Sequence, residues 1–362
     1  MKVFFLLILL TQTGFAQQFS ISGIVKDKST GNPVLFAHIY IANTTQGTTS
    51  DSDGRFRIDQ IPEGRFTLIC TMVGYESYLQ IINALDADSM EITIELIPSS
   101  QVLDEIELKG QVDKKWRRQF KIFERELFGD VPNAARCEIM NPWVVDFETQ
   151  GLYNNFHAHA DQPLIIHNKI LGYKISFLLK RFEIEQDQLL YVGFPGFEPL
   201  DVKDWDSSEN FFRNREDTFK GSTRHFFYAL IFDRLKEEGF KVYRATQKYD
   251  EYWPNRLSDA VNGGYLRQLE ASEIIVGKDY MGNYKIYTDD FIEIIYSEKI
   301  WGNSPYQDAP YEVSRLKLND QLVVASHGYI FNPFSFVVYG YLSEERVANM
   351  LPYEYGIERI SH

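Results

Sequence analysis

The stretch "TTSDSDGRF" occupies residues 48–56 and separates segments in which polar and apolar residues alternate. Its aspartates and its glycine are spaced as in the first half of a calcium-binding loop. That alignment puts Thr49 at the first ligand position and Gln60 at the twelfth, where such a loop needs carboxylates. A tight turn between two strands uses the same residues, because aspartate accepts backbone N–H groups and glycine adopts a positive φ. We therefore predict a structural turn, formed by Asp51, Asp53 and Gly54.

On both sides of this turn the chain has the pattern of short strands. In "RFTLICTM", residues 65–72, polar and apolar side chains alternate, which is typical of a strand with one buried face. Many short strands with regular turns predict a β-sandwich. The expected strands are residues 19–27, 34–43, 54–58, 65–73, 76–82 and 90–97.

Several of these residues also mark a known domain family. They are Gly23 and Val25, Gly31 to Val34, Ala37, Ile39 to Ile41, Thr49, Asp51, Gly54, Phe56, Gly74 and Tyr75. With these marks, residues 19–98 resemble the carboxypeptidase-regulatory-like domain, a seven-strand, transthyretin-like β-sandwich with a carbohydrate-binding-like fold. The family is abundant in exported proteins of Bacteroidota, often at the N-terminus of TonB-dependent receptors. The resemblance implies a fold and a cell envelope, but no peptidase activity, since no histidine is followed three residues later by Glu.

The first sixteen residues, "MKVFFLLILLTQTGFA", have the parts of a secretory signal peptide. Lys2 supplies the positive charge, residues 3–10 form the apolar core, and Gly14 and Ala16 precede the expected cleavage site. No later stretch is apolar enough to cross a bilayer as a helix. We expect an exported protein of a Gram-negative bacterium, in the periplasm or associated with the outer membrane and not membrane-spanning.

The composition is that of a globular protein with an acidic surface. The formal net charge of −14 argues against nucleic acid as a partner, which needs a basic face, and less strongly against anionic lipid. There are two cysteines, Cys70 and Cys137. Cys70 lies on the apolar face of an expected strand, which favours a free buried thiol, although an oxidising compartment permits a disulfide.

Residues 99–130 have the pattern of a linker strand followed by a helix. An apolar stripe at helical spacing marks the helix, and Gly129 can end it. The stripe consists of Trp116, Phe120, Phe123 and Leu127. Four cations crowd the first turn, where the helix dipole disfavours them, namely Lys114, Lys115, Arg117 and Arg118. They fit a solvated face better than a contact with an anionic partner.

Residues 131–362 have the pattern of an α+β domain in which strands dominate. The expected strands are residues 143–148, 154–160, 170–185, 188–194, 240–245, 283–298, 314–319 and 334–342. A helix is expected at residues 222–239, with Ser222 as its N-cap, and a short one at residues 344–351. Together with a sandwich at residues 17–98, this makes the expected fold mainly β.

The segment "HAHAD", residues 157–161, is the best metal candidate in the chain. In a strand, His157, His159 and Asp161 share one face, and two histidines at this spacing with a carboxylate can bind zinc or another divalent ion. A half-buried strand with a wet polar face gives the same pattern, and we favour that interpretation. The nearby segment "RFEIEQD" places Arg181 among same-face carboxylates, which we also interpret as solvated.

Aromatic loops with Pro or Gly offer a possible platform for stacking on a sugar. The candidate residues are Tyr252, Trp253, Trp301 and Tyr306. Aromatic side chains in β folds are more often core residues or cross-strand pairs, so core packing is the favoured interpretation of each.

None of the common catalytic motifs occurs, whether H-E-x-x-H, G-x-S-x-G, a phosphate-binding loop or C-x-x-C. We therefore expect a secreted, non-enzymatic envelope protein without a cofactor. Its β-sandwich would be an accessory and interaction module for a larger binding domain, and its partner an envelope protein or a glycan. Two alternatives stay open: a metal-dependent hydrolase that uses His157, His159 and Asp161, and a carbohydrate-binding protein.

Overall fold

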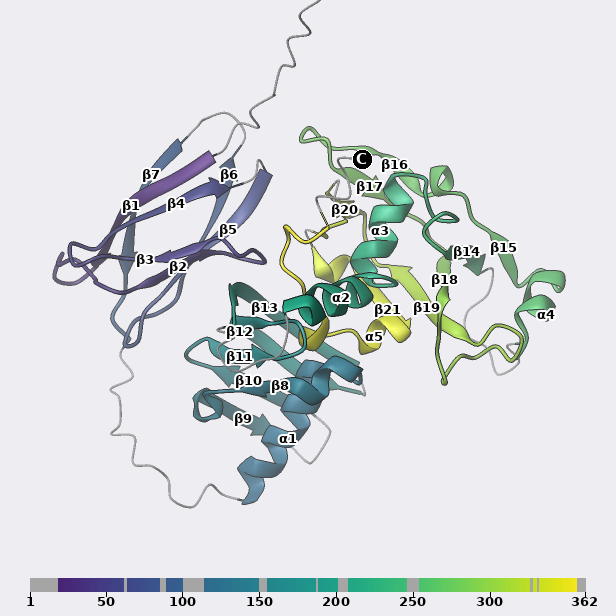
Figure 1. Cartoon of the computed structure of the whole chain (residues 1–362), viewed down its shortest axis with the longest axis horizontal. Coiled ribbons are helices and arrows are strands. Elements are labelled where there is room, and N and C mark those ends of the chain that lie inside the picture. The colour runs from purple at the N-terminus through teal and green to yellow at the C-terminus, as the bar shows by residue number, and fades with distance from the viewer. Residues whose placement is uncertain are drawn as a thin grey trace, which may run out of the picture. The chain divides into compact units, whose positions relative to one another are not determined.

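The computed structural model describes residues 19–61, 64–84, 89–99, 114–149, 155–186, 188–200, 208–245, 254–325, 328–330 and 332–356. The chain divides into two compact units (Figure 1). The first comprises Met1–Ile41 and Gln46–Ser100, and the second comprises Ala42–Thr45 and Gln101–His362. Strands dominate both units, which confirms the expected mainly β fold. The expected signal peptide lies outside the described residues.

Seven described strands form two sheets in the first unit. They are β1 (Phe19–Asp27), β2 (His38–Ile41), β3 (Gly47–Thr49), β4 (Arg55–Ile61), β5 (Gly64–Thr71), β6 (Tyr78–Ala84) and β7 (Ser89–Leu96). The sheets have the orders β4-β1-β7 and β3-β2-β5-β6, and β1 and β7 run parallel. Apolar side chains from both sheets, including Ile21, Ile39 and Leu68, are fully buried, as a sandwich requires.

Two details of the sandwich differ from the expected strands. The strand expected at residues 34–43 begins only at His38, because Phe36 adopts a positive φ of 58°. Ser50 holds this irregular segment, since its hydroxyl accepts from the backbone N–H of Ala37 at 2.9 Å. Strand β3 was not expected, because three residues are too few to show an alternating pattern.

Three sheets make up most of the described part of the second unit. The first has the order β8-β11-β12-β10-β9, with β13 along the other edge of β12; the others have the orders β15-β14-β18-β19-β21 and β16-β17-β20. The strands are β8 (Cys137–Ile139), β9 (Val145–Thr149), β10 (Phe156–Ala160), β11 (Leu164–Asn168), β12 (Tyr173–Glu185), β13 (Gln188–Pro199), β14 (Phe240–Ala245), β15 (Leu266–Gln268), β16 (Ile275–Lys278), β17 (Tyr284–Ile286), β18 (Phe291–Ile300), β19 (Tyr311–Leu318), β20 (Leu322–Val324) and β21 (Phe336–Gly340).

Two helices bury apolar faces against these sheets. In α1, Phe123 packs edge-on against Phe182 of β12 with ring centroids 4.7 Å apart. In α3, Phe226 packs against Phe240 of β14 in a separate core. The α-helices are α1 (Lys114–Phe128), α2 (Ser208–Phe219), α3 (Thr223–Ile231), α4 (Leu257–Asn262) and α5 (Tyr341–Glu344). The short 3-10 helices are η1 (Pro132–Arg136), η2 (Pro142–Val144), η3 (Ala271–Glu273), η4 (Pro333–Ser335) and η5 (Val347–Asn349).

Helix α3 is shorter than the sequence pattern indicates. Its N-cap is Ser222, as expected, whose side chain accepts from the backbone N–H of His225 at 3.1 Å. It ends at Ile231 rather than near Gly239, and Asp233 then adopts a positive φ of 55°. The helix expected at residues 344–351 is only the 3-10 turn η5. Glu345 and Arg346, which precede this turn, line a pocket.

Candidate functional site

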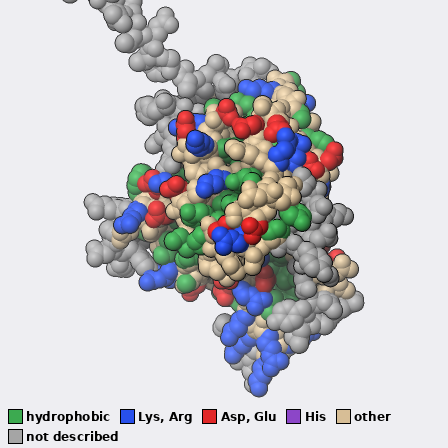
Figure 2. Space-filling view, turned by 90° about the vertical axis from the view of Figure 1, so that its right-hand side faces the viewer, with side chains coloured by type: hydrophobic (Ala, Val, Ile, Leu, Met, Phe, Trp, Pro, Cys, Tyr) green, Lys and Arg blue, Asp and Glu red, His purple; other side chains and the backbone are tan. Residues whose placement is uncertain are grey.

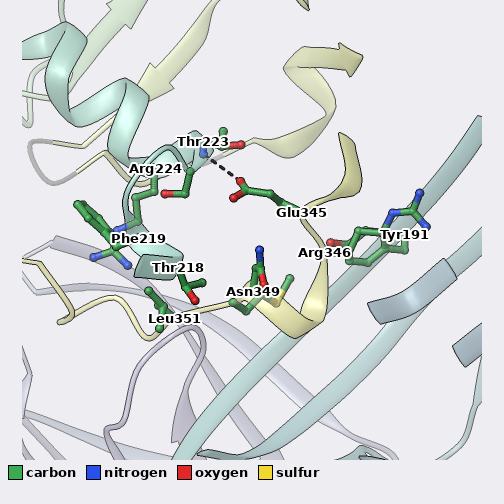
Figure 3. Close-up of a pocket in the computed structure, with 11 residues that line it drawn as sticks. Tyr191, Thr218, Phe219, Thr223, Arg224, Glu345, Arg346, Asn349 and Leu351 are labelled. Carbon is green, nitrogen blue, oxygen red and sulfur yellow. Dashed lines mark hydrogen bonds between the residues drawn. The ribbon is translucent and has the colours of Figure 1, made fainter. Parts of the chain in front are cut away.

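A pocket of about 210 Å³ lies in the second unit, where the connection between α2 and α3 approaches the residues after α5 (Figure 3). Its walls also include one side chain of β13. The lining combines rings and aliphatic chains with a few polar groups. The lining side chains that matter most for its chemistry are Tyr191, Thr218, Thr223, Glu345, Arg346 and Asn349.

The carboxyl group of Glu345 points toward the first turn of α3 (Figure 3). It accepts a hydrogen bond from the backbone N–H of Thr223 at 3.2 Å. Burial raises the pKa of Glu345 to about 8, although this N–H group and Lys299 favour the charged form. At neutral pH the group is therefore mostly protonated, so it can donate a hydrogen bond as well as accept one.

A second carboxyl group, that of Glu312 on β19, lies behind the same connection. Glu312 is 5% exposed, and its Oε2 has no hydrogen-bond partner among the described residues. Burial raises its pKa to about 7, against the opposing effect of Lys299. Gly221 permits this approach, because a Cβ atom there would lie 2.7 Å from the Oε2 of Glu312. Two carboxyl groups that resist ionisation thus lie next to the start of α3.

The two arginines at the pocket already bind other groups of the protein. Arg224 donates to the carbonyl oxygens of Pro352 at 2.9 Å and Tyr353 at 2.7 Å. Arg346 donates to both the carbonyl and the carboxylate of Glu126, each at 2.6 Å. Arg346 is thus paired with a carboxylate, and Arg224, which keeps its charge, directs N–H groups to backbone carbonyls. With these donors occupied within the protein, the pocket suits a ligand with uncharged polar groups better than an anion that needs free donors.

The serine and histidine beside the pocket do not form a nucleophile and its base. His225 is 2% exposed, and its Nδ1 accepts from the backbone N–H of Gly221 at 3.0 Å. Its Nε2 lies 3.1 Å from a carboxylate oxygen of Glu238. Both ring nitrogens are thus engaged away from the hydroxyl of Ser222, which itself accepts from the His225 backbone.

The expected metal residues lie on or just after β10, where Phe156 and Ala158 are buried and His157 and His159 face outward. In the sheet, His159 is opposite Asp146 of β9, and Asp161 follows the strand on the surface. The structure therefore spreads the "HAHAD" residues along a wet sheet face.

His157 instead meets two carboxylates of the neighbouring strand β12. Its Nδ1 lies 3.7 Å from Glu183 and its Nε2 lies 3.8 Å from Glu185. One ligand atom from each of these three residues lies within 4.8 Å of the others, and this is the one such group in the described part of the chain. Arg181 would compete with a metal ion for Glu183, since its guanidinium binds that carboxylate and lowers its pKa. The sequence shows both strands but not the register that joins them.

Two of the four aromatic candidates are described, and both pack against other side chains of the protein. Tyr306 is 1% exposed, and its hydroxyl donates to the buried carboxylate of Glu293, so it belongs to the core and not to a stacking platform. Trp301 packs edge-on against Tyr341 with ring centroids 5.9 Å apart. Tyr252 and Trp253 lie outside the described residues.

The predicted turn, with Asp51, Asp53 and Gly54, lies between β3 and β4. The Oδ1 of Asp51 accepts from the backbone N–H groups of Asp53 at 2.9 Å and Arg55 at 2.8 Å. Gly54 has a φ of 74°, and a Cβ atom there would lie 2.5 Å from the carbonyl oxygen of Val25. The two cysteines, Cys70 and Cys137, are both free.

Comparison with known proteins identifies the first unit. Residues 21–108 match the CarboxypepD_reg-like domain family. This chain therefore carries a carboxypeptidase-regulatory-like domain at its N-terminal end, as the resemblance of residues 19–98 implied. Over 109 residues the chain is also 33% identical to the TonB-dependent receptor SusC of Bacteroides thetaiotaomicron. The match covers 30% of this chain and only 10% of the receptor.

Similar solved structures overlap only a small part of the chain. One is a cohesin–X-dockerin complex of Acetivibrio cellulolyticus, with 22% identity over 22% of this chain and 56% of that chain, at a TM-score of 0.19. Another is the C-terminal domain of the shaft pilin SpaA of Lactobacillus rhamnosus GG, with 17% identity over 23% of this chain and 98% of that chain, at a TM-score of 0.19. Among the described residues, no helix is both long and apolar enough to cross a membrane.

Proposed function

We propose that this chain is a secreted, non-enzymatic protein of a bacterial cell envelope. In this proposal the β-sandwich is an accessory module and the second unit is the binding domain. The observation that carries it is the N-terminal match, to a regulatory-like family and to a segment of an envelope receptor. A module with no catalytic role, joined to a separate compact unit, suits a chain that presents the second unit to a partner.

The pocket beside Glu345 is the contact site that this proposal assigns to the second unit. Its arginines already bind protein groups, and its acid is mostly protonated at neutral pH, which favours a partner that offers uncharged polar groups. A glycan hydroxyl or a peptide amide on an envelope protein has this chemistry.

A cross-linking pull-down from the native envelope tests the proposal. Thr223→Phe places a ring in the pocket and keeps the backbone N–H that binds Glu345. We expect the wild type to capture a partner that Thr223→Phe loses. The control Val276→Phe, at an exposed position on β16, should still capture it. Turnover of a peptide or glycan panel that Glu345→Gln abolishes would instead show an enzyme.

A second candidate function is binding of a divalent cation by His157, Glu183 and Glu185. The proximity of their ligand atoms favours it, and the histidine nitrogen and the carboxylate oxygens are both atom types that bind zinc. Protein purified without chelator should then contain an ion that His157→Ala loses and His159→Ala retains. Loss in both variants would favour the hydrolase alternative with His157, His159 and Asp161.

A further inference from the structure

The N-terminal half of α1 carries a dense group of exposed cations. The α1 cation surface consists of Lys114, Lys115, Arg117, Arg118 and Lys121, all exposed. Figure 2 shows Lys and Arg side chains gathered at the lower end of the described surface, with few acidic side chains among them. This region is basic in a chain whose formal net charge is −14.

Part of this positive charge has no ion-pair partner among the described residues. The first turn of α1 contains no acidic residue, and no described residue forms an ion pair with Lys114, Arg117 or Arg118. The positive end of the helix dipole opposes cations at this position, so their placement there costs stability. Three like charges in a locally unfavourable position, without an ion-pair partner among the described residues, point to an external anion.

The opposite face of α1 is fixed to the sheet beneath it. Trp116 donates from its indole nitrogen to the carbonyl oxygen of Val145 at 3.0 Å and stacks on Phe120 with ring centroids 4.9 Å apart. One turn later, Phe123 and Leu127 are completely buried. The cations are therefore held on a rigid support from the first turn of the helix onward.

The arrangement of the cations distinguishes between anionic partners. Lys114, Arg117, Arg118 and Lys121 stand at i, i+3, i+4 and i+7, so they share one convex helix face, with Lys115 beside it. They extend along about 10 Å of the helix axis, which is too far for them to enclose a single anion. An extended layer of phosphate groups can meet all of them together. The acidic remainder of the chain interferes little, because salt screens charges beyond about 8 Å at physiological ionic strength.

We propose that the α1 cation surface docks the second unit onto membranes that contain anionic phospholipids. This goes beyond the proposed function and does not involve the pocket, so either proposal can fail without the other. The net charge of −14 argues against binding to anionic lipid, but that number is a sum over the whole chain. A membrane interacts only with the surface that faces it, and the α1 cation surface is positive.

Co-sedimentation of the full chain with vesicles tests this docking. Vesicles of phosphatidylcholine mixed with phosphatidylglycerol should bind the wild type at physiological ionic strength, and vesicles of phosphatidylcholine alone should not. Lys114→Gln/Arg117→Gln/Arg118→Gln should weaken binding on the order of a hundredfold, since each cation near such a surface contributes about a factor of five. High salt should release the wild type.

A matched control removes three exposed cations elsewhere, in Lys28→Gln/Arg65→Gln/Lys236→Gln. It changes the net charge equally and should bind as the wild type does. No binding of the wild type, or equal losses in both triple variants, overturns the proposal. Retention on immobilised poly-glutamate without binding to anionic vesicles also overturns it, in favour of an acidic protein partner. Unchanged melting of both variants checks that they fold.

Discussion

The carboxyl groups of Asp51 and Glu345 both accept hydrogen bonds from backbone N–H groups, but the donors come from different distances along the chain. Asp51 is exposed and takes its donors from residues two and four positions later. Glu345 takes its donor from Thr223, which is 122 residues away. The first carboxylate shapes a turn, whereas the second is positioned only after two distant segments have packed together.

The two sites also differ in how far their carboxyl groups are exposed to solvent. Asp51 is exposed, so its carboxylate stays hydrated while its hydrogen bonds fix the conformation of the turn. Glu345 is half-buried in the wall of the pocket, and burial raises its pKa despite the nearby Lys299. The Asp51 turn therefore contributes to folding. The Glu345 site has a carboxyl group with a raised pKa, which can donate a hydrogen bond to a ligand.

The largest predicted effect tests whether the turn requires a glycine at position 54. Gly54→Val should lower the free energy of unfolding of the first unit by about 3 kcal/mol, through a positive φ and a contact with the carbonyl of Val25. The control Gly31→Val has a similar φ of 72° but no atom within 4 Å of its Cβ position, so it should cost about 1 kcal/mol.

Thiol labelling can measure this effect in the full chain. In a Cys137→Ser background, the one remaining thiol is that of Cys70, which is fully buried in β5 and whose pKa burial raises to about 12. It should react only when the first unit opens, so its labelling across a denaturant series reports the stability of that unit. Equal midpoints for the two glycine variants would contradict the close approach to Val25.

The next largest effect depends on pH and tests the isolation of Glu345. Its pKa is 4.5 in an unfolded chain and about 8 in the folded one, so the folded state holds the proton more tightly. Wild-type stability should therefore fall as pH rises from 4.5 to 8. Glu345→Gln cannot ionise, so it should be more stable than the wild type by about 2 kcal/mol at pH 6 and equal to it well below pH 4.5.

Tryptophan fluorescence reports this change selectively, because all five tryptophans follow residue 115. The control Glu298→Gln removes an exposed carboxylate on β18 and should show no such dependence on pH. The groups that face Glu345 are Lys299, Glu312 and Asn349, together with the backbone of Thr223. A difference between Glu345→Gln and wild type that stays constant across this pH range would show that Glu345 is well hydrated.

Local patterns predicted those parts of the fold that depend on neighbouring residues. The bounds of β1 and β14, and the N-cap Ser222, follow from alternation and from capping chemistry within a few residues. The end of α3 was wrong, because the positive φ of Asp233 has no signal in an otherwise helical pattern. The strand expected at residues 283–298 is likewise divided into β17 and β18.

The candidate sites needed information that the sequence does not contain. The pocket combines Tyr191, Thr223 and Glu345 from three distant segments, and none of them belongs to a motif. The partners of His157 depend on the register between β10 and β12, in which a shift of one residue would turn Glu183 to the other face. Chemistry that depends on long-range packing was therefore not visible in the sequence, even where its individual residues had been noticed.

The smallest predicted effect separates the charge of Asp51 from its geometry. Asp51→Ala removes the acceptor of two backbone N–H groups, which water can partly replace at this exposed position, so the first unit should lose about 1 kcal/mol. Asp51→Asn keeps an oxygen in the same place and should lose much less, because asparagine forms the same kind of turn. Labelling of Cys70 would rank the two variants. If asparagine were as destabilising as alanine, the charge of Asp51 would matter more than its hydrogen bonds, and the turn would differ from the largely uncharged Glu345 site in its electrostatics as well as in the distance to its donors.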